Sequence, residues 1–523
     1  MRPLWSALLL LLASCASPAE PPRERVDLVI RGGTVYTGSE APFVGDVAIS
    51  GDRIRAVGPE LAFSAARVLD ARGMIVAPGF IDPHTHAGEQ LASTDPQARL
   101  VPAFLMQGVT TAFIGNDGGG DADVAAVLGR SLRQPVGVNF AAFVGFGAVR
   151  GAVLGQVDRA PTAAELIRMR RMVADAMCGG ALGLSTGLFY APQSFATTAE
   201  VSALAREAGL RGGIYDSHIR DESSYTIGLA AAVDEAVAIG RDAGLPVNIS
   251  HIKALGVDVH GQAPAIVARI ERARAAGQRV TADQYPWSAS GTSLVAALVP
   301  RWAQDGGREA LLRRFDDSGL SPRLRSEMAD NLRRRGGAES LRITEGPNRG
   351  QTLAEVAAAQ SADAIAAAIA VIRVRDPSVA SFNQTEADIA AFMRRPWVMT
   401  GSDASTGHPR AFGSFARKYR EYVVRRRVLT LREFIERSTA LTADTFRLAD
   451  RGRLRPGAFA DVVVFDPSRY AERATYEQPT LLAEGVRTVL VNGVPAVENW
   501  RLTGAAAGRG LAQRPPAGSC PQR

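Results

Sequence analysis

Two patterns of apolar positions divide the chain into two flanks and a middle. Residues 26–70 and 452–503 alternate apolar and polar side chains with a period of two, as in Asp46-Val-Ala-Ile49, and this alternation predicts half-buried β-strands. Ser50-Gly-Asp52 separates two such runs and predicts a hairpin turn. Because both ends of the chain carry the pattern, we predict one small β-sandwich domain built from residues 26–74 and 452–505.

The middle of the chain, residues 75–451, alternates short apolar runs with helical segments. A threonine followed three residues later by glutamate marks helix starts at Thr162, Thr197 and Thr430. Eight alternating strand and helix units predict an α/β fold of the (β/α)8 or TIM-barrel class. The predicted strands are Met74–Pro78, Thr110–Gly115, Val138–Gly145, Ala181–Ser185, Gly213–Ser217, Val247–Ser250, Arg279–Asp283 and Val398–Thr400.

One stretch of the middle is too long for a single barrel helix. Residues 291–395 follow the seventh predicted strand and are rich in Ala and Arg. We predict a helical insertion there that covers the mouth of the barrel. Residues 506–523 are rich in Gly and Pro, and we expect a tail over this range.

The N-terminus has the pattern of a targeting segment. Arg2 precedes an apolar run, Leu4–Leu12, that is too short to span a membrane and is typical of a secretory signal peptide. Leu12-Ala-Ser-Cys15 resembles the lipoprotein box of bacteria, which implies cleavage before Cys15 and lipidation of its thiol. A plain secretory signal is the alternative. We therefore expect a signal over residues 1–15, a polar tether over 16–25, and a periplasmic protein that contacts the membrane only through its lipid.

The composition is that of a globular protein with a basic balance. The 523 residues are 46% hydrophobic and 22% charged, and the formal net charge is +7. These values argue against a disordered chain and against a protein of many membrane spans. The arginines are scattered and do not alternate with aromatic side chains, so we expect a small-molecule substrate and no nucleic-acid partner. Lysine is rare, because Lys253 and Lys418 are the only two.

The three cysteines are too few for a disulfide scaffold. Cys178 lies in an apolar stretch, which predicts a thiol in the core. Cys520 lies in the tail. A bridge between Cys178 and Cys520 stays open, since no pattern in the sequence supports it.

Four of the six histidines, with two aspartates, fall where predicted barrel strands end. Active sites of such barrels lie at that face, so these side chains are expected to converge. Six nitrogen and oxygen ligands suit one or two first-row metal ions. The predicted ligands are His84, His86, Asp117, His218, His251 and Asp403. His260 lies past a strand end and is expected at the surface, and His408, after the last strand, lies either beside the site or in a structural position.

The motifs around these residues resemble the amidohydrolase superfamily and, within it, the N-acyl-D-amino-acid deacylases or D-aminoacylases. The resemblance runs over nearly the whole mature chain. It rests on Gly79-Phe-Ile-Asp-Pro-His-Thr-His86, Gly108-Val-Thr-Thr111, Gly180-Ala-Leu-Gly-Leu-Ser-Thr-Gly-Leu188, Ser217-His-Ile-Arg-Asp-Glu222, Ser250-His-Ile-Lys253, Asp283-Gln-Tyr-Pro286, Gly401-Ser-Asp403 and Ala460-Asp-Val-Val-Val-Phe465. It implies a barrel of the metal-dependent hydrolase type, with zinc as the expected cofactor.

The resemblance also implies a role for each matched residue. His218 and His251 hold the tighter metal ion together with a ligand from the second strand. His84, His86 and Asp403 form the companion site. Asp403 is in addition the general acid and base.

Three further residues, Lys253, Tyr285 and Arg410, are implied to grip the α-carboxylate of the substrate. One position departs from the pattern, because the family commonly has cysteine where this chain has Asp117. A carboxylate is a harder ligand than a thiolate and is able to bridge two ions. Asp117 therefore leaves the identity and the number of the metal ions open, and we expect it to remain a ligand.

The constellation predicts amide hydrolysis. A metal ion lowers the pKa of a bound water towards about 7, so hydroxide is available to attack an amide carbonyl while Asp403 takes the proton and delivers it to the departing amine. With the resemblance, this predicts removal of the acyl group from N-acyl-D-amino acids.

Three alternatives stay open. The first is a D-dipeptidase. The second is a hydantoinase-like hydrolase of cyclic amides, although the fourth predicted strand lacks the metal-bridging lysine that many of those enzymes have. The third is a non-catalytic metal-binding lipoprotein, which predicts loss of Asp403, and Asp403 is present.

Overall fold

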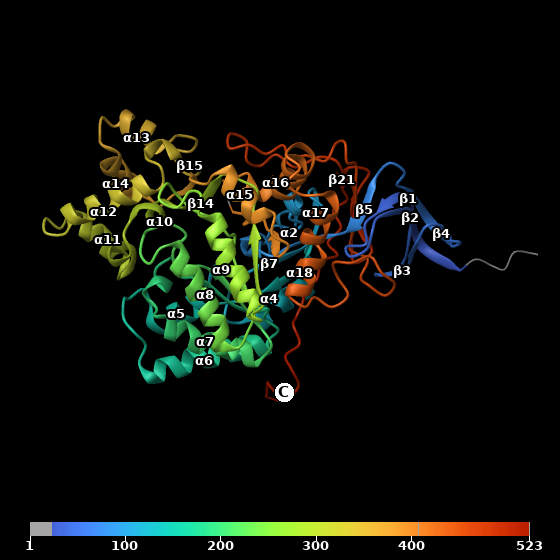
Figure 1. Cartoon of the computed structure of the whole chain (residues 1–523), viewed down its shortest axis with the longest axis horizontal. Coiled ribbons are helices and arrows are strands. Elements are labelled where there is room, and N and C mark those ends of the chain that lie inside the picture. The colour runs from blue at the N-terminus through green and yellow to red at the C-terminus, as the bar shows by residue number, and fades with distance from the viewer. Residues whose placement is uncertain (1–23, 406, 522–523) are drawn as a thin grey trace, which may run out of the picture.

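The computed structural model describes residues 24–405 and 407–521 (Figure 1). The predicted signal peptide, Cys15 and nearly all of the predicted tether lie outside the described residues. The strands β1–β4 lie at one end of the molecule and the helices α11–α14 lie at the other, with the barrel between them.

Strands from both ends of the chain share one nine-stranded sheet. Its order is β21-β20-β19-β18-β5-β1-β2-β3, and β4 pairs with β1. Antiparallel pairing of β5 with β18 joins the two ends of the chain. The predicted hairpin links β2 to β3, with Ser50 opposite Arg53. The strands are β1 (Arg25–Val35), β2 (Phe43–Ser50), β3 (Arg53–Gly58), β4 (Ser64–Asp70), β5 (Ile75–Pro78), β18 (Val462–Phe465), β19 (Val486–Val491), β20 (Val494–Glu498) and β21 (Arg501–Leu502).

Parallel strands in eight positions build the barrel, so the predicted fold class is confirmed. β6, β7 and β8 form one sheet, and β9, β10, β11, β12, β13 and β17 form another. Phe143 lies between β8 and β9, which occupy one position, and a bridge from Thr85 to Ala404 connects the first and last positions. The strands are β6 (Phe80–Asp82), β7 (Val109–Ile114), β8 (Asn139–Ala142), β9 (Val144–Gly145), β10 (Gly183–Gly187), β11 (Ile214–His218), β12 (Val247–Ile249), β13 (Val280–Gln284) and β17 (Val398–Thr400).

The first predicted barrel strand is wrong. Met74–Pro78 corresponds to β5, which belongs to the nine-stranded sheet, and the barrel begins instead with β6. The chain crosses between the two sheets at Gly79. A Cβ atom there would lie 2.2 Å from Oγ1 of Thr110, so only glycine allows this close approach.

Helices surround the barrel, and their starts follow the predicted caps. Complete capping boxes are present at Thr162 and Thr430. At Thr197 the glutamate, Glu200, accepts a hydrogen bond from Arg150 Nε (3.1 Å). The helices are α1 (Gly88–Leu91), α2 (Pro96–Arg99), α3 (Pro102–Leu105), α4 (Val124–Gly129), α5 (Phe146–Leu154), α6 (Ala163–Cys178), α7 (Thr198–Leu210), α8 (Leu229–Ala243), α9 (Ala263–Ala275), α15 (Glu386–Met393), α16 (Arg410–Arg417), a π-helix (Lys418–Arg425), α17 (Leu431–Ser438) and α18 (Ala440–Thr445).

The insertion after β13 is not purely helical, which corrects the prediction. It contains α10 (Leu294–Leu298), α11 (Gly307–Asp316), α12 (Ser321–Arg334), α13 (Leu353–Ala359) and α14 (Ala364–Val374), with an apolar core of its own. It also contains an antiparallel sheet of β14 (Ala289–Ser293), β16 (Ser378–Phe382) and β15 (Leu341–Ile343). β14 lacks apolar alternation and becomes a strand through its five-residue pairing with β16.

Over residues 24–405 and 407–521, no single helix is long and apolar enough to cross a membrane. The pair α13 and α14, bent by 94°, passes that test only when the two helices are taken together.

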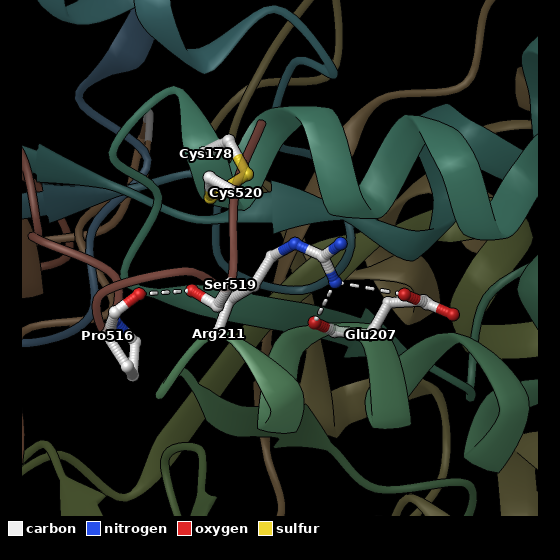
Figure 2. Close-up of a disulfide and its surroundings, with 6 residues drawn as sticks. All are labelled: Cys178, Glu207, Arg211, Pro516, Ser519 and Cys520. Carbon is white, nitrogen blue, oxygen red and sulfur yellow. Dashed lines mark hydrogen bonds and ion pairs between the residues drawn. A yellow bond between two sulfur atoms is a disulfide. The ribbon is translucent and has the colours of Figure 1, made fainter. Parts of the chain in front are cut away.

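A disulfide between Cys178 and Cys520 links the C-terminal tail to the end of α6 (Figure 2). Cys178 is therefore not the free core thiol that the sequence predicted. The tail also pairs with the barrel near the start of β8, where Leu511 N donates to Phe140 O (2.7 Å) and Gln513 N donates to Gly180 O (3.0 Å). The tail therefore lies at the N-terminal ends of the barrel strands, opposite the expected active site.

Candidate functional site

The predicted metal ligands converge at the C-terminal face of the barrel. His84 and His86 follow β6, and their Nε2 atoms lie 3.6 Å and 3.1 Å from Oδ1 of Asp403, which follows β17. Because successive side chains of an extended segment alternate between two faces, the spacing of two brings both imidazoles to one face.

Asp117, which follows β7, lies at the centre of the cluster. Its Oδ1 is 3.4 Å from Nε2 of His84 and 3.4 Å from Nε2 of His251, and 3.9 Å from Nδ1 of His218. Its Oδ2 is 3.5 Å from Nε2 of His86. One carboxylate thus faces both pairs of histidines.

These spacings and the unpartnered atoms fit a metal ion. Two ligand atoms at about 2.05 Å from one tetrahedral ion lie about 3.3 Å apart, close to the separations around Asp117. Both ring nitrogens of His84, Nε2 of His218 and Oδ1 of Asp117 are buried and have no hydrogen-bond partner among the described residues. Nitrogen and carboxylate donors in this number suit zinc and other first-row divalent ions.

The electrostatics of the cluster favour a cation. Burial lowers the pKa of His218 to about 3, so the ring is neutral, as a metal ligand must be. Burial also opposes charge on His86, but Asp117 and Asp403 outweigh it and raise the pKa of His86 to about 9. Burial alone would raise the pKa of Asp117, yet the His84 and His251 rings hold it well below its usual value. The carboxylates therefore attract positive charge to this point.

Three of these positions have a left-handed backbone. The φ angles are 56° at Asp117, 34° at His251 and 49° at Asp403. Residues other than glycine rarely adopt this region, and such strain concentrates at functional sites. The barrel therefore holds these three side chains in place at a cost in backbone energy.

Glu222 is a site residue that the sequence analysis did not single out. Its Oε1 lies 2.6 Å from Nζ of Lys253 and 3.1 Å from Nδ1 of His251, and its Oε2 lies 3.7 Å from Nε2 of His218. Its position four residues after His218, inside a motif of the family resemblance, was the available signal. Carboxylates behind metal-binding histidines fix the orientation of their rings.

The three residues expected to bind the substrate carboxylate also come together. Lys253 Nζ and the Arg410 guanidinium lie 5.6 Å and 5.0 Å from the centre of the Tyr285 ring. Each cation already has an acidic neighbour: Lys253 pairs with Glu222, and Nη1 of Arg410 lies 2.7 Å from Oδ2 of Asp403. Arg410 therefore touches the proposed acid and base as well as the substrate space.

A cavity of about 440 Å³ opens above these side chains. The insertion closes one side of it, since β14, the end of α12 and β16 contribute Ser290, Arg335 and Val379 to the lining. The predicted insertion thus lies over the mouth, with strands as well as helices.

The two remaining histidines differ in position. His408 is buried and lines the cavity; its Nδ1 accepts a hydrogen bond from Arg410 N (3.1 Å), and its Nε2 lies 3.1 Å from Ala289 O. It thus fixes the start of α16, from which Arg410 projects. His260 is exposed, as the sequence predicted, and its Nε2 lies 3.1 Å from Asn383 O.

Comparison with known proteins identifies the class to which this barrel belongs. The sequence matches the Amidohydrolase family over residues 67–497, so the chain belongs to the amidohydrolase family. It is 37% identical to the N-acyl-D-glutamate deacylase of Alcaligenes xylosoxydans xylosoxydans over 90% of this chain and 93% of that protein. It is 35% identical to the D-aminoacylase of the same organism over 93% of this chain and 98% of that protein. Within the family, the chain therefore stands with the D-aminoacylases and related deacylases.

Solved structures agree with this placement. The N-acyl-D-glutamate deacylase from Bordetella bronchiseptica, complexed with zinc and a phosphonate mimic of the tetrahedral intermediate, superposes with a TM-score of 0.80 at 34% identity, over 94% of this chain and 100% of that chain. A D-aminoacylase superposes with a TM-score of 0.80 at 32% identity, over 93% and 100%. A D-hydantoinase, at 14% identity and a TM-score of 0.56, shares the fold only.

Proposed function

We propose that this protein is a metal-dependent hydrolase that converts N-acyl-D-amino acids to a carboxylate and a free D-amino acid. The observation that carries the proposal is the Asp117 carboxylate between two pairs of histidines, with Asp403 facing one pair, at the mouth of a deacylase-type barrel. Relatives named for D-glutamate, D-aspartate and D-amino acids in general support the D configuration.

The ligands proposed for the metal are the four histidines with Asp117 and Asp403. One cluster joins His84, Asp117, His251 and Asp403, and a second joins His218 and His251 with Glu222. Zinc is the proposed ion, in one or two copies, because the Bordetella deacylase was solved with zinc. When bound, the ion supplies Lewis acidity to the carbonyl and lowers the pKa of water.

Asp403 is the proposed general base and acid. Burial by itself would raise its pKa, but the Arg410 guanidinium and nearby histidines keep its pKa far below the usual range. The carboxylate is therefore ionised at neutral pH and able to accept a proton from water. The same oxygen then delivers that proton to the leaving amine nitrogen.

The substrate α-carboxylate is proposed to lie between Lys253, Tyr285 and Arg410. Charge-assisted hydrogen bonds from two cations fix its orientation. Three fixed points, namely this carboxylate, the carbonyl at the metal cluster and the side chain, distinguish the two enantiomers.

The test is release of amino acid from matched N-acetyl-D and N-acetyl-L substrates by the zinc-loaded protein. We expect at least about 100-fold higher kcat/KM for the D enantiomer. Equal rates for both enantiomers would remove the D-specific assignment, and no release from either would remove the deacylase assignment.

We further propose that the mature protein is lipidated at Cys15 and lies in the periplasm. The Cys178–Cys520 disulfide supports this location, because such bonds persist in oxidising compartments. Fractionation of cells that express the full chain or Cys15→Ala tests it. We expect the full chain in the membrane fraction and the variant in the soluble fraction; membrane association of the variant would contradict the lipid anchor.

A further inference from the structure

Arg335, directly after α12, places a buried cation in the wall of the active-site cavity. The residue is 1% exposed and lines the cavity together with His218 and Lys253. Its Nε donates to Ala297 O (3.2 Å), but its Nη1 has no hydrogen-bond partner among the residues that the structure describes. In the described part of the chain, no acidic side chain lies within ion-pair distance of it.

A second guanidinium reinforces the positive charge. Arg301 lies 3.8 Å from the centre of the Phe189 ring, and Phe189 lines the cavity 5.6 Å from the His218 ring. Arg301 also lacks an acidic partner over residues 24–405 and 407–521, and its Nη1 donates to the carbonyls of Ala296 (3.3 Å) and Val299 (3.4 Å).

The aromatic side chain next to both cations is Tyr225. Its ring centre lies 5.6 Å from the Arg335 guanidinium, and its buried hydroxyl has no hydrogen-bond partner within residues 24–405 and 407–521. Burial lowers the pKa of Arg301 to about 10. Arg301 therefore stays charged at neutral pH. Of these three residues, Arg335 lines the active-site cavity, whereas Arg301 and Tyr225 line a separate pocket together with Trp302 and Arg334.

The cations that line the cavity differ in whether an acidic side chain contacts them. Lys253 and Arg410 each contact an acidic side chain, whereas Arg335 contacts none in the described part of the chain. A buried charge without a partner is costly, and a guanidinium binds carboxylates with two parallel hydrogen bonds. A ligand carboxylate would satisfy the free Nη1 of Arg335.

We propose that Arg335, with Arg301 beside it, forms a second anion-binding subsite, and that the preferred substrates carry a second carboxylate besides the α-carboxylate. This inference rests on the proposed function and narrows its substrate class. The second carboxylate belongs either to an acidic D-amino-acid side chain or to a dicarboxylic acyl group, since both present the same anion to a guanidinium.

Four substrates separate the two sources on the unmodified zinc-loaded protein. N-acetyl-D-glutamate is compared with N-acetyl-D-glutamine, and N-succinyl-D-alanine with N-butyryl-D-alanine. We expect the charged member of one pair to have a kcat/KM at least about tenfold higher, and the pair that shows it identifies the source. Hydrolysis without any preference for charge overturns the subsite alone, whereas no hydrolysis of all four overturns the proposed function together with it.

A pair of variants tests Arg335 itself. Arg335→Gln is expected to lower kcat/KM for the preferred charged substrate by about 10- to 100-fold and to leave its neutral counterpart within about threefold. Arg333→Gln is the matched control, because Arg333 lies near the end of α12, two residues before Arg335, is 54% exposed and pairs with Asp258 (2.8 Å). Equal losses on both substrates would contradict the assignment.

Inhibition by products gives a readout that does not depend on a variant. Free D-glutamate is expected to inhibit the unmodified protein at a concentration at least about tenfold lower than D-glutamine does, if the side chain is the source. If the acyl group is the source, succinate is expected to inhibit at a concentration at least about tenfold lower than butyrate does. Equal inhibition within both pairs overturns the subsite even where Arg335→Gln does not fold.

Discussion

Nη1 of Arg410 lies 2.7 Å from Oδ2 of Asp403, while Oδ1 of the same carboxylate faces His86 Nε2 at 3.1 Å. The carboxylate thus lies between the permanently charged Arg410 guanidinium and the proposed metal-binding histidines. This arrangement keeps Asp403 ionised and directs one oxygen toward the reacting groups.

Removal of the carboxylate charge should stop turnover. Asp403→Asn is expected to lower kcat by about 10²- to 10⁴-fold, because the amide cannot accept a proton from water. The four histidines and Asp117 remain, so metal content per chain, measured by elemental analysis, should stay unchanged. Asp316→Asn, at a 70% exposed position, serves as the control. Normal turnover in Asp403→Asn would exclude it as the base.

Removal of the Arg410 charge should move the pH dependence. Arg410 holds the pKa of Asp403 down, so Arg410→Gln raises that pKa, and the acid limb of kcat/KM moves to higher pH. The measurement is a pH profile from pH 4 to pH 9. An acid limb at an unchanged pH, with only a uniform loss of rate, would assign Arg410 to substrate binding alone.

The ion pair of Lys253 with Glu222 should contribute to the stability of the fold, and Lys253 should in addition contribute to substrate binding. Lys253→Met removes the cation paired with the buried Glu222 carboxylate. This loss is expected to lower the free energy of unfolding by about 3–5 kcal/mol and to raise KM for substrates with an α-carboxylate. The double variant Lys253→Met/Glu222→Gln should recover most of that loss but keep the raised KM for substrates with an α-carboxylate. Denaturant unfolding and steady-state kinetics measure the two effects. A double variant with a normal KM would remove Lys253 from substrate binding.

The tail disulfide should stabilise the fold without contributing to catalysis. Cys178→Ser opens a loop between residues 342 positions apart and is expected to lower the free energy of unfolding by about 2–5 kcal/mol. Activity at 25 °C should change little, because the bond lies at the face of the barrel opposite the site. A reductant should lower the Tm of the unmodified protein to that of the variant; no effect of reductant would show that the bond does not contribute.

Lys418 should make stability depend on pH. Burial lowers its pKa well below the usual 10.5, so the unfolded chain binds one proton more than the folded chain at pH values between the two. The free energy of unfolding therefore rises with pH in that window. Lys418→Met is expected to raise it by about 1–2 kcal/mol at pH 7, with a gain that shrinks towards pH 10. Arg394→Met, exposed and without an ion pair in the described chain, is the control. A gain independent of pH would contradict the buried-charge explanation.

Local patterns in the sequence were sufficient to predict the local structure and most of the site chemistry. Apolar alternation and capping residues act over a few positions, so the barrel class, the strands of the flanks and the helix starts at Thr162 and Thr430 could be predicted. The ligand residues were recognisable because each follows a strand, and strand ends meet at one face of a barrel.

Contacts between groups that are distant in the sequence could not be predicted in this way, because they depend on how the whole chain packs. An apolar run such as Ile75–Pro78 fits either sheet, and its partner β18 lies almost 400 positions away in the chain. The bond between Cys178 and Cys520, the pairing of Glu222 with Lys253 and the burial of Arg335 in the cavity wall depend in the same way on contacts far apart in sequence. Side-chain charge and apolar pattern are local properties, whereas burial and partners are set by the packing of the whole chain.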